Sequence, residues 1–251
     1  MCLLAIAWQA HAEYPLVVCA NRDEFLARPT QSAHFWHDAP DVYAGRDLLG
    51  GGTWMGISRQ GRFAALTNIR DPASNRDDAR SRGLLVSRFL QGRETALGYC
   101  RQLQRNGALY NGYNFIAFDG NSLVYQSNAL GSPRILPAGV HGISNAVIDV
   151  PWPKIVSASN KLTEWLKNPT EVKQLAMLMQ DRRLAPDEQL PTTGVTLDLE
   201  RGLSAEYIDL PGYATRCSTG LMLHRSGHAQ YCEITHQQSC SSRQLRVDGF
   251  C

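Results

Sequence analysis

Residues 2–8 read Cys-Leu-Leu-Ala-Ile-Ala-Trp, and residues 14–20 read Tyr-Pro-Leu-Val-Val-Cys-Ala, directly before the polar stretch Asn21-Arg22-Asp23-Glu24. Both are short apolar runs of the kind that forms a buried β-strand. The few residues between them are enough for a turn, so the two strands can pair as an antiparallel hairpin whose far ends meet. We therefore predict that Cys2 lies beside Asn21–Glu24.

An apolar N-terminus of this kind can also belong to a signal peptide, and Ala10-His11-Ala12 resembles a cleavage site. However, no Lys or Arg precedes the apolar run, and the run is only about as long as the shortest hydrophobic region of such peptides. We therefore interpret residues 2–8 as the first strand of the fold.

The rest of the chain alternates between hairpin patterns and amphipathic patterns. Further short apolar runs predict strands at Thr53–Ser58, Arg62–Asn68, Tyr113–Asp119, Ser122–Ser127, Thr215–His224 and Ala229–Thr235. Helical spacing predicts helices at Asp77–Gln91, Glu94–Arg105, Ile155–Leu166 and Glu171–Gln180, and the polar residues 181–193 predict a loop. Short turns between the strands indicate antiparallel pairing. We predict an α+β fold of two antiparallel sheets with helices outside, as one domain over residues 1–251.

The composition excludes several classes of protein. The 251 residues include 25 Lys and Arg and 23 Asp and Glu, a formal net charge of +2, with 43% hydrophobic and 19% charged residues. This is typical of a folded globular chain and not of a nucleic-acid binder, which would carry a basic stripe. No run approaches the roughly 20 apolar residues of a membrane-spanning helix, so we expect no stable membrane insertion. The seven scattered cysteines form no CxxC pair, which indicates free thiols and a cytoplasmic location.

Cys2 differs from the other cysteines because it follows the initiator methionine. Removal of Met1, which is normal before a small residue, would give Cys2 both a thiol and a free α-amine. The amine has a pKa of roughly 7.7–8.0 and can act as a base, while the thiolate is the nucleophilic form of the thiol. Arg22 would lower the pKa of the thiol, and Asp23 or Glu24 would orient the amine. The alternative is a structural Cys2 beside a solvent-exposed charged turn.

The motifs along the chain are similar to those of one known family. Cys2 with Asn21-Arg22-Asp23-Glu24 resembles the NRDE family, also called the transport and Golgi organisation protein 2 family. The resemblance continues through Gly51-Gly52-Thr53-Trp54-Met55-Gly56, Ala65-Leu66-Thr67-Asn68, Tyr113-Asn114-Phe115, Gly142-Ile143-Ser144-Asn145, Pro151-Trp152-Pro153-Lys154 and Tyr213-Ala214-Thr215-Arg216. Ala214 departs from the glycine that is usual there. The motifs keep their order over residues 1 to 235, so the match is specific.

The resemblance implies the fold of the N-terminal-nucleophile hydrolases, a four-layer αββα sandwich. The cysteine branch of that superfamily, which includes penicillin V acylase and bile-salt hydrolase, uses an N-terminal Cys to cleave a non-peptide amide. Carried over by position, the catalytic residues are Cys2 as nucleophile, Arg22 and Asp23 as the charged pair, Asn68 and Asn145 as oxyanion donors, and Arg216 as a late arginine. Because the hydrolases usually space the Arg and Asp apart, Asn21 and Glu24 are competing assignments as binding residues. A turn-capping role is the structural alternative for Asn68 and Asn145.

Two classes of function follow from this resemblance. The first is a cysteine amidohydrolase that acts on a small-molecule or lipid-like non-peptide amide through a Cys2 acyl-thioester, without a metal or cofactor. The second is a non-catalytic protein that carries haem, or handles a lipid, in the same cleft, because the family has been linked to intracellular haem trafficking. Haem needs an axial ligand. No histidine has a spacing that singles it out, including His34, His37, His224, His228 and His236, so the Cys2 thiol is the alternative ligand. In both cases the expected partner is a small hydrophobic molecule.

Overall fold

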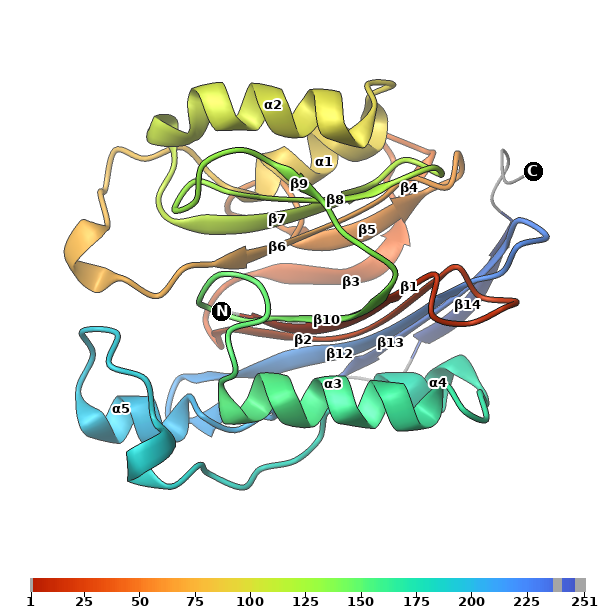
Figure 1. Cartoon of the computed structure of the whole chain (residues 1–251). Coiled ribbons are helices and arrows are strands. Elements are labelled where there is room, and N and C mark those ends of the chain that lie inside the picture. The colour runs from red at the N-terminus through yellow and green to blue at the C-terminus, as the bar shows by residue number, and fades with distance from the viewer. Residues whose placement is uncertain (1, 237–240, 247–251) are drawn as a thin grey trace.

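The computed structural model describes residues 2–236 and 241–246, which form two antiparallel seven-stranded sheets between two layers of helices (Figure 1). The predicted α+β sandwich, with its layers in the order helix, sheet, sheet, helix, is confirmed.

The first sheet has the strand order β10-β1-β2-β12-β13-β14, and β11 pairs with β12. Its strands are β1 (Cys2–Trp8), β2 (Leu16–Phe25), β10 (Gly139–Ile143), β11 (Asp209–Leu210), β12 (Tyr213–Leu223), β13 (His228–Thr235) and β14 (Ser241–Arg246). The second sheet runs in sequence order from β3 to β9. Its strands are β3 (Thr30–Phe35), β4 (Val42–Asp47), β5 (Met55–Ser58), β6 (Phe63–Asn68), β7 (Tyr113–Phe118), β8 (Leu123–Ser127) and β9 (Arg134–Ile135).

The helices lie on the outer faces of the two sheets. Helices α1 (Gly83–Gln91) and α2 (Ala96–Asn106) cover the second sheet, while α3 (Pro153–Trp165) and α4 (Val172–Ala176) cover the first. Helix α5 (Leu197–Gly202) lies in the same layer as α3 (Figure 1). Among the helices of residues 2–236 and 241–246, none combines the length and the apolar character needed to cross a bilayer.

Strand β1 explains why the N-terminus belongs to the core. Its side chains alternate between two apolar layers, because successive residues of a strand point to opposite faces. Leu4 and Ile6 pack between the sheets, whereas Leu3 and Ala5 pack against the α3 layer. All seven residues are buried, so the interpretation of residues 2–8 as a strand is confirmed.

The sequence pattern missed several elements and misplaced some ends. Strand β3 has mostly polar, partly exposed side chains and lies at an edge of its sheet, and β10 contains two glycines. Neither shows the apolar run from which strands were predicted. The helix predicted from Asp77 begins only at Gly83, and the one predicted from Glu171 ends at Ala176.

Candidate active site

The predicted meeting of Cys2 with the polar stretch of β2 is confirmed. Strands β1 and β2 pair antiparallel with Cys2 opposite Arg22. Strand β12 pairs with the other edge of β2, where Cys217 lies opposite Arg22. Because residues that face one another across paired strands share a face of the sheet, these three side chains point the same way. The face is the one between the two sheets, where Cys2 belongs to the central apolar core.

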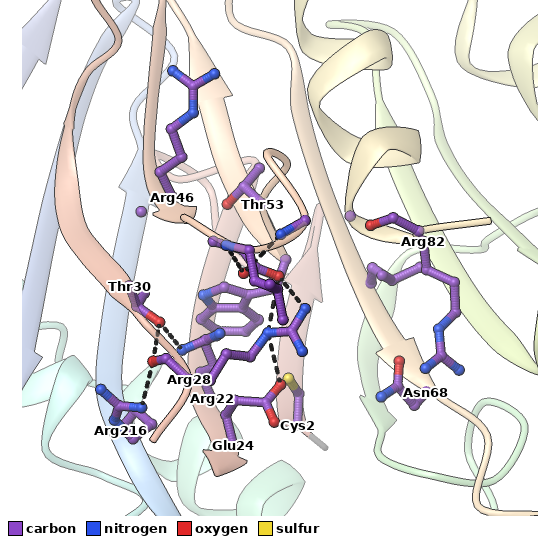
Figure 2. Close-up of a pocket in the computed structure, with 18 of the residues that line it drawn as sticks. Cys2, Arg22, Glu24, Arg28, Thr30, Arg46, Thr53, Asn68, Arg82 and Arg216 are labelled. Atoms are coloured by element: carbon purple, nitrogen blue, oxygen red, sulfur yellow. Dashed lines mark hydrogen bonds and ion pairs between the residues drawn. The ribbon is translucent and has the colours of Figure 1, made fainter. Parts of the chain in front are cut away.

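A cleft of about 740 Å³ opens beside Cys2 and Arg22. Its lining includes Cys2, Arg22, Asp23, Glu24, Asn68 and Arg216 among the residues predicted from the sequence. Figure 2 shows Arg216 on one side of Cys2, and Asn68 beside Arg82 on the other. The cleft therefore brings six of the eight predicted site residues together.

The Cys2 thiol is not activated by its surroundings alone. The residue is 7% exposed, and burial raises the pKa of the thiol to about 11. Arg22 and a hydrogen bond from the backbone N–H of Asp23 both lower this pKa, as predicted for Arg22, but burial outweighs them. Nucleophilic chemistry at Cys2 therefore requires a base at neutral pH.

The period of two along β2 divides the polar stretch between the faces of the sheet. Arg22 and Glu24 belong to the cleft side, whereas Asn21 points to the α3 layer, where its amide donates to the carbonyls of Met179 at 2.7 Å and Glu206 at 2.9 Å. Asn21 does not line the cleft, so the geometry gives no support to its assignment as a binding residue. Its side chain instead ties the sheet to the loops beneath it.

Asp23 occupies the buried side of the same strand. Its carboxylate is 1% exposed and accepts a hydrogen bond from Thr215 Oγ1 at 2.7 Å, and the Tyr213 hydroxyl donates to its backbone carbonyl at 3.0 Å. Burial raises the pKa of Asp23, and the nearby Lys154 ammonium opposes that shift. Because Cys2 pairs with Arg22, the next position along β2 places Asp23 beside the α-nitrogen of Cys2.

Glu24 and Arg216 shape the wall of the cleft. Glu24 lies 3.9 Å from Arg28, which also binds Asp47 at 2.7 Å. Arg216 donates to the carbonyl of Phe25 at 2.8 Å. It also donates to the carbonyl of Arg28 at 3.1 Å (Figure 2). Arg216 therefore lies in the cleft wall and holds the turn after β2 through its Nη1 atom.

The two predicted oxyanion donors differ in position. Asn68 ends β6 and lines the cleft, and its side-chain amide has no hydrogen bond within the described part of the chain. Asn145 is 1% exposed and does not line the cleft; its amide donates to the backbone carbonyl of Asn68 at 2.9 Å. Of the two side chains, only that of Asn68 therefore lines the cleft, and Asn145 holds the Asn68 backbone from outside it.

Sequence reasoning missed three buried charged residues beneath Cys2. Lys154, Arg70 and Glu200 are buried and line one small cavity together. The signal for Lys154 was present in the sequence, because residues 154, 158 and 162 share one helix face and Ala158 and Leu162 on that face are buried. The helix predicted from the sequence begins at Ile155, one residue after Lys154, so this signal appears only once the helix is extended back to Pro153. Lysine is almost never fully buried without a partner.

The cleft is also richer in arginine than the motifs indicated. It contains seven arginines, Arg22, Arg28, Arg46, Arg76, Arg80, Arg82 and Arg216. Arg28 and Arg46 pair with carboxylates, whereas Arg22 and Arg82 donate only to the Thr30 hydroxyl and the Gly112 carbonyl within residues 2–236 and 241–246. The same residues contain no group of three or more His, Cys, Asp or Glu side chains that could hold a metal ion.

The chain is similar in sequence to known proteins over most of its length. The family model described as Transport and Golgi organisation 2 matches residues 1–238. The Transport and Golgi organization protein 2 homolog of Bos taurus is 35% identical over 240 residues, which cover 88% of this chain and 86% of that protein. The Homo sapiens homolog is 33% identical over 238 residues, with the same coverage of 88% and 86%.

A solved structure shares the fold despite low sequence identity. The mutant C2A conjugated bile acid hydrolase from Clostridium perfringens superimposes with a TM-score of 0.54 at 8% identity, covering 99% of this chain and 93% of that one. The two antiparallel sheets and their outer helices are thus those of an N-terminal-nucleophile hydrolase fold. The family model over residues 1–238 and the relatives at 35% and 33% identity establish that the chain belongs to the Transport and Golgi organisation 2 family.

Proposed function

We propose that the protein is an N-terminal cysteine amidohydrolase that cleaves a small-molecule amide in the cleft. The observation that supports this most strongly is the position of Cys2, whose thiol lies in the cleft between Arg22 and the backbone N–H of Asp23. The buried thiol needs a base, and removal of Met1 creates one on the same residue. The α-amine of Cys2 then serves as that base near neutral pH.

The reaction takes place in two balanced halves. The amine accepts the proton of the Cys2 thiol, the sulfur attacks the amide carbonyl carbon, and the C–N bond breaks as the protonated amine gives its proton to the leaving nitrogen. This yields a thioester and a free amine product. A water molecule then attacks the thioester, again with the α-amine as base, and releases a carboxylic acid and the Cys2 thiol.

Asn68 is the side chain best placed to stabilise the oxyanion of each step. Its amide lines the cleft, and Asn145 fixes the backbone that carries it. Removal of one oxyanion donor typically slows catalysis ~10²–10³-fold. We therefore assign donation to Asn68 and a supporting role to Asn145.

The charge of the cleft indicates which amides fit. Besides its seven arginines it has five carboxylate residues, Asp23, Glu24, Asp47, Asp77 and Glu233. Arg22, 6% exposed, and Arg82 both face this space without an ion pair in the described ranges. Guanidinium groups that face a cleft without an ion-pair partner bind carboxylates or phosphates strongly. We infer that the substrate carries an anionic group beside its amide, with an apolar portion against residues such as Trp54 and Leu66.

The competing function is a carrier for haem or a lipid in the same cleft. Of the described residues that line it, none is a histidine, methionine or tyrosine, and the thiols are those of Cys2 and Cys217. A haem bound here would therefore take a cysteine as its axial ligand.

The test uses the chain that begins at Cys2, with its N-terminus checked by intact mass, and the Cys2→Ala chain as control. N-octanoylglycine and the uncharged N-propyloctanamide are compared as substrates by measuring octanoate release. The proposal predicts release that requires Cys2 and that is faster for the anionic amide. A Soret band on adding haem, lost in Cys2→Ala, together with no octanoate release would favour the carrier instead.

A further inference from the structure

A buried lysine lies beneath the candidate active site without lining the cleft. Lys154 is in the first turn of α3 and is 4% exposed, and its Nζ donates to the backbone carbonyl of Leu203 at 2.8 Å. Burying an ammonium group costs free energy unless an opposite charge lies nearby. We therefore expect a negatively charged group near Lys154.

The charged residues near Lys154 identify that partner. Arg70 and Glu200 form a buried ion pair with each other. The remaining carboxylate that attracts Lys154 most strongly is Asp23, which is 1% exposed on β2. Burial raises the pKa of Asp23 and lowers that of Lys154 to about 8, and their mutual attraction opposes both shifts.

Asp23 in turn contacts Cys2. Its backbone N–H donates to the Cys2 sulfur, and the strand register places Asp23 beside the α-nitrogen of Cys2. On its other sides Asp23 meets the hydroxyls of Thr215 and Tyr213, which both donate to it. A charged carboxylate is a stronger acceptor than a neutral acid, so the ionisation of Asp23 governs how firmly it can hold the amine.

Resting on the proposed function, we propose that Lys154 is a positioning residue that keeps Asp23 ionised, so that Asp23 accepts a hydrogen bond from the α-amine of Cys2 and holds the amine against the thiol. Lys154 does not touch the substrate. It acts through Asp23, from the opposite face of the sheet. Loss of its charge leaves Asp23 to be protonated and the amine without its acceptor.

The experiment measures alkylation of Cys2 by iodoacetamide between pH 6 and 9, resolved by peptide mass spectrometry, in the full chain that begins at Cys2. The variants are Lys154→Gln, which removes the charge but retains a hydrogen-bond donor, Lys154→Arg, Asp23→Asn and the double variant Asp23→Asn/Lys154→Gln. The matched control is Lys161→Gln, because Lys161 is a lysine of the same helix that pairs with Glu206 at 2.7 Å.

The proposal predicts that Lys154→Gln slows alkylation at pH 7 about tenfold, as expected for a change of one pKa unit. Lys154→Arg and Lys161→Gln should stay near wild type, and Lys154→Gln should add nothing in the Asp23→Asn background. The proposal would be overturned if Lys154→Gln left the rate of Cys2 alkylation unchanged. It would also be overturned if Lys154→Gln lowered that rate equally in the wild-type and the Asp23→Asn chains. If Lys154→Gln does not fold, Lys154→Arg tests the proposal instead. Because this variant keeps the positive charge, slow alkylation of its Cys2 would overturn the proposal.

This readout is separate from turnover. A chain that shows the predicted pattern of alkylation but cleaves no amide would contradict the proposed function and leave the role of Lys154 standing. If Lys154→Gln changes neither amide cleavage nor alkylation, the proposed function stands and the role of Lys154 is contradicted.

Discussion

The reactivity of Cys2 should depend on whether its nitrogen is free. With the nitrogen in a peptide bond, burial raises the pKa of the thiol to about 11. At pH 7 only about one thiol in 10⁴ is then ionised, against about one in 30 for an unperturbed thiol of pKa ~8.5, a difference of roughly 300-fold. The rate of alkylation should therefore rise about tenfold for each pH unit through the neutral and mildly alkaline range.

A free α-amine changes this profile because it accepts the thiol proton within the same residue. We expect the chain that begins at Cys2 to be alkylated about 100-fold faster at pH 7.5 than a chain with one glycine placed ahead of Cys2, and its profile to level off near pH 8, the pKa range of an α-amine. The assay is site-resolved alkylation by iodoacetamide between pH 6 and 10, with circular dichroism to confirm folding at each pH.

Cys217 provides the internal reference. It lines the same cleft, and burial raises its pKa well above the ordinary value. Its slow alkylation should be identical in the two chains. Equal and equally steep profiles for Cys2 in both chains would refute the reasoning, because the amine would then have no part in activating the thiol.

Three further predictions concern the scaffold. Asn21→Ala removes three buried hydrogen bonds and should lower the free energy of unfolding by about 2–3 kcal/mol in urea titrations, while the cleft thiol keeps its alkylation rate; the reverse pattern would return Asn21 to the site. Gly52→Ala would put a Cβ 2.3 Å from the backbone of Gly83 and should cost about 1–3 kcal/mol, and an unchanged unfolding midpoint would show that the turn can shift freely. The hydrogen bond that His141 Nδ1 donates to the Asp149 carboxylate raises the pKa of His141. The pair therefore stabilises the fold below about pH 6.5 and loses its effect as the pH rises through the raised pKa. The difference in Tm between wild type and His141→Gln should therefore be largest in acid and shrink in alkali, and a difference that grows in alkali would contradict this.

The hairpin at the N-terminus could be predicted because local rules determine it. Two apolar runs and a short turn leave one simple pairing, and that pairing brings Cys2 to Arg22. The same rules define the later hairpins, such as β7 with β8. Edge strand β3 was not predicted because its side chains are mostly polar and partly exposed, so it contains no apolar run.

The candidate site was only partly predictable, for two physical reasons. The period of two along β2 sends Asn21 away from Arg22, a rule that was available from the sequence but needs the strand to extend through the polar stretch. The burial of Lys154 beneath Asp23 depends instead on how α3 packs against the first sheet, 131 residues further along the chain than Asp23 (154 − 23). No local pattern in β2 indicates which charge will compensate its carboxylate.

The central claim is that Cys2 itself takes the acyl group of an amide. The direct measurement is a single turnover of N-octanoylglycine by excess enzyme that begins at Cys2, quenched in acid and analysed by peptide mass. We predict an octanoyl thioester on the peptide that starts with Cys2, formed together with one equivalent of glycine and absent in Cys2→Ala. Recovery of intact N-octanoylglycine, or glycine release at the same rate from the Cys2→Ala chain, would contradict the account.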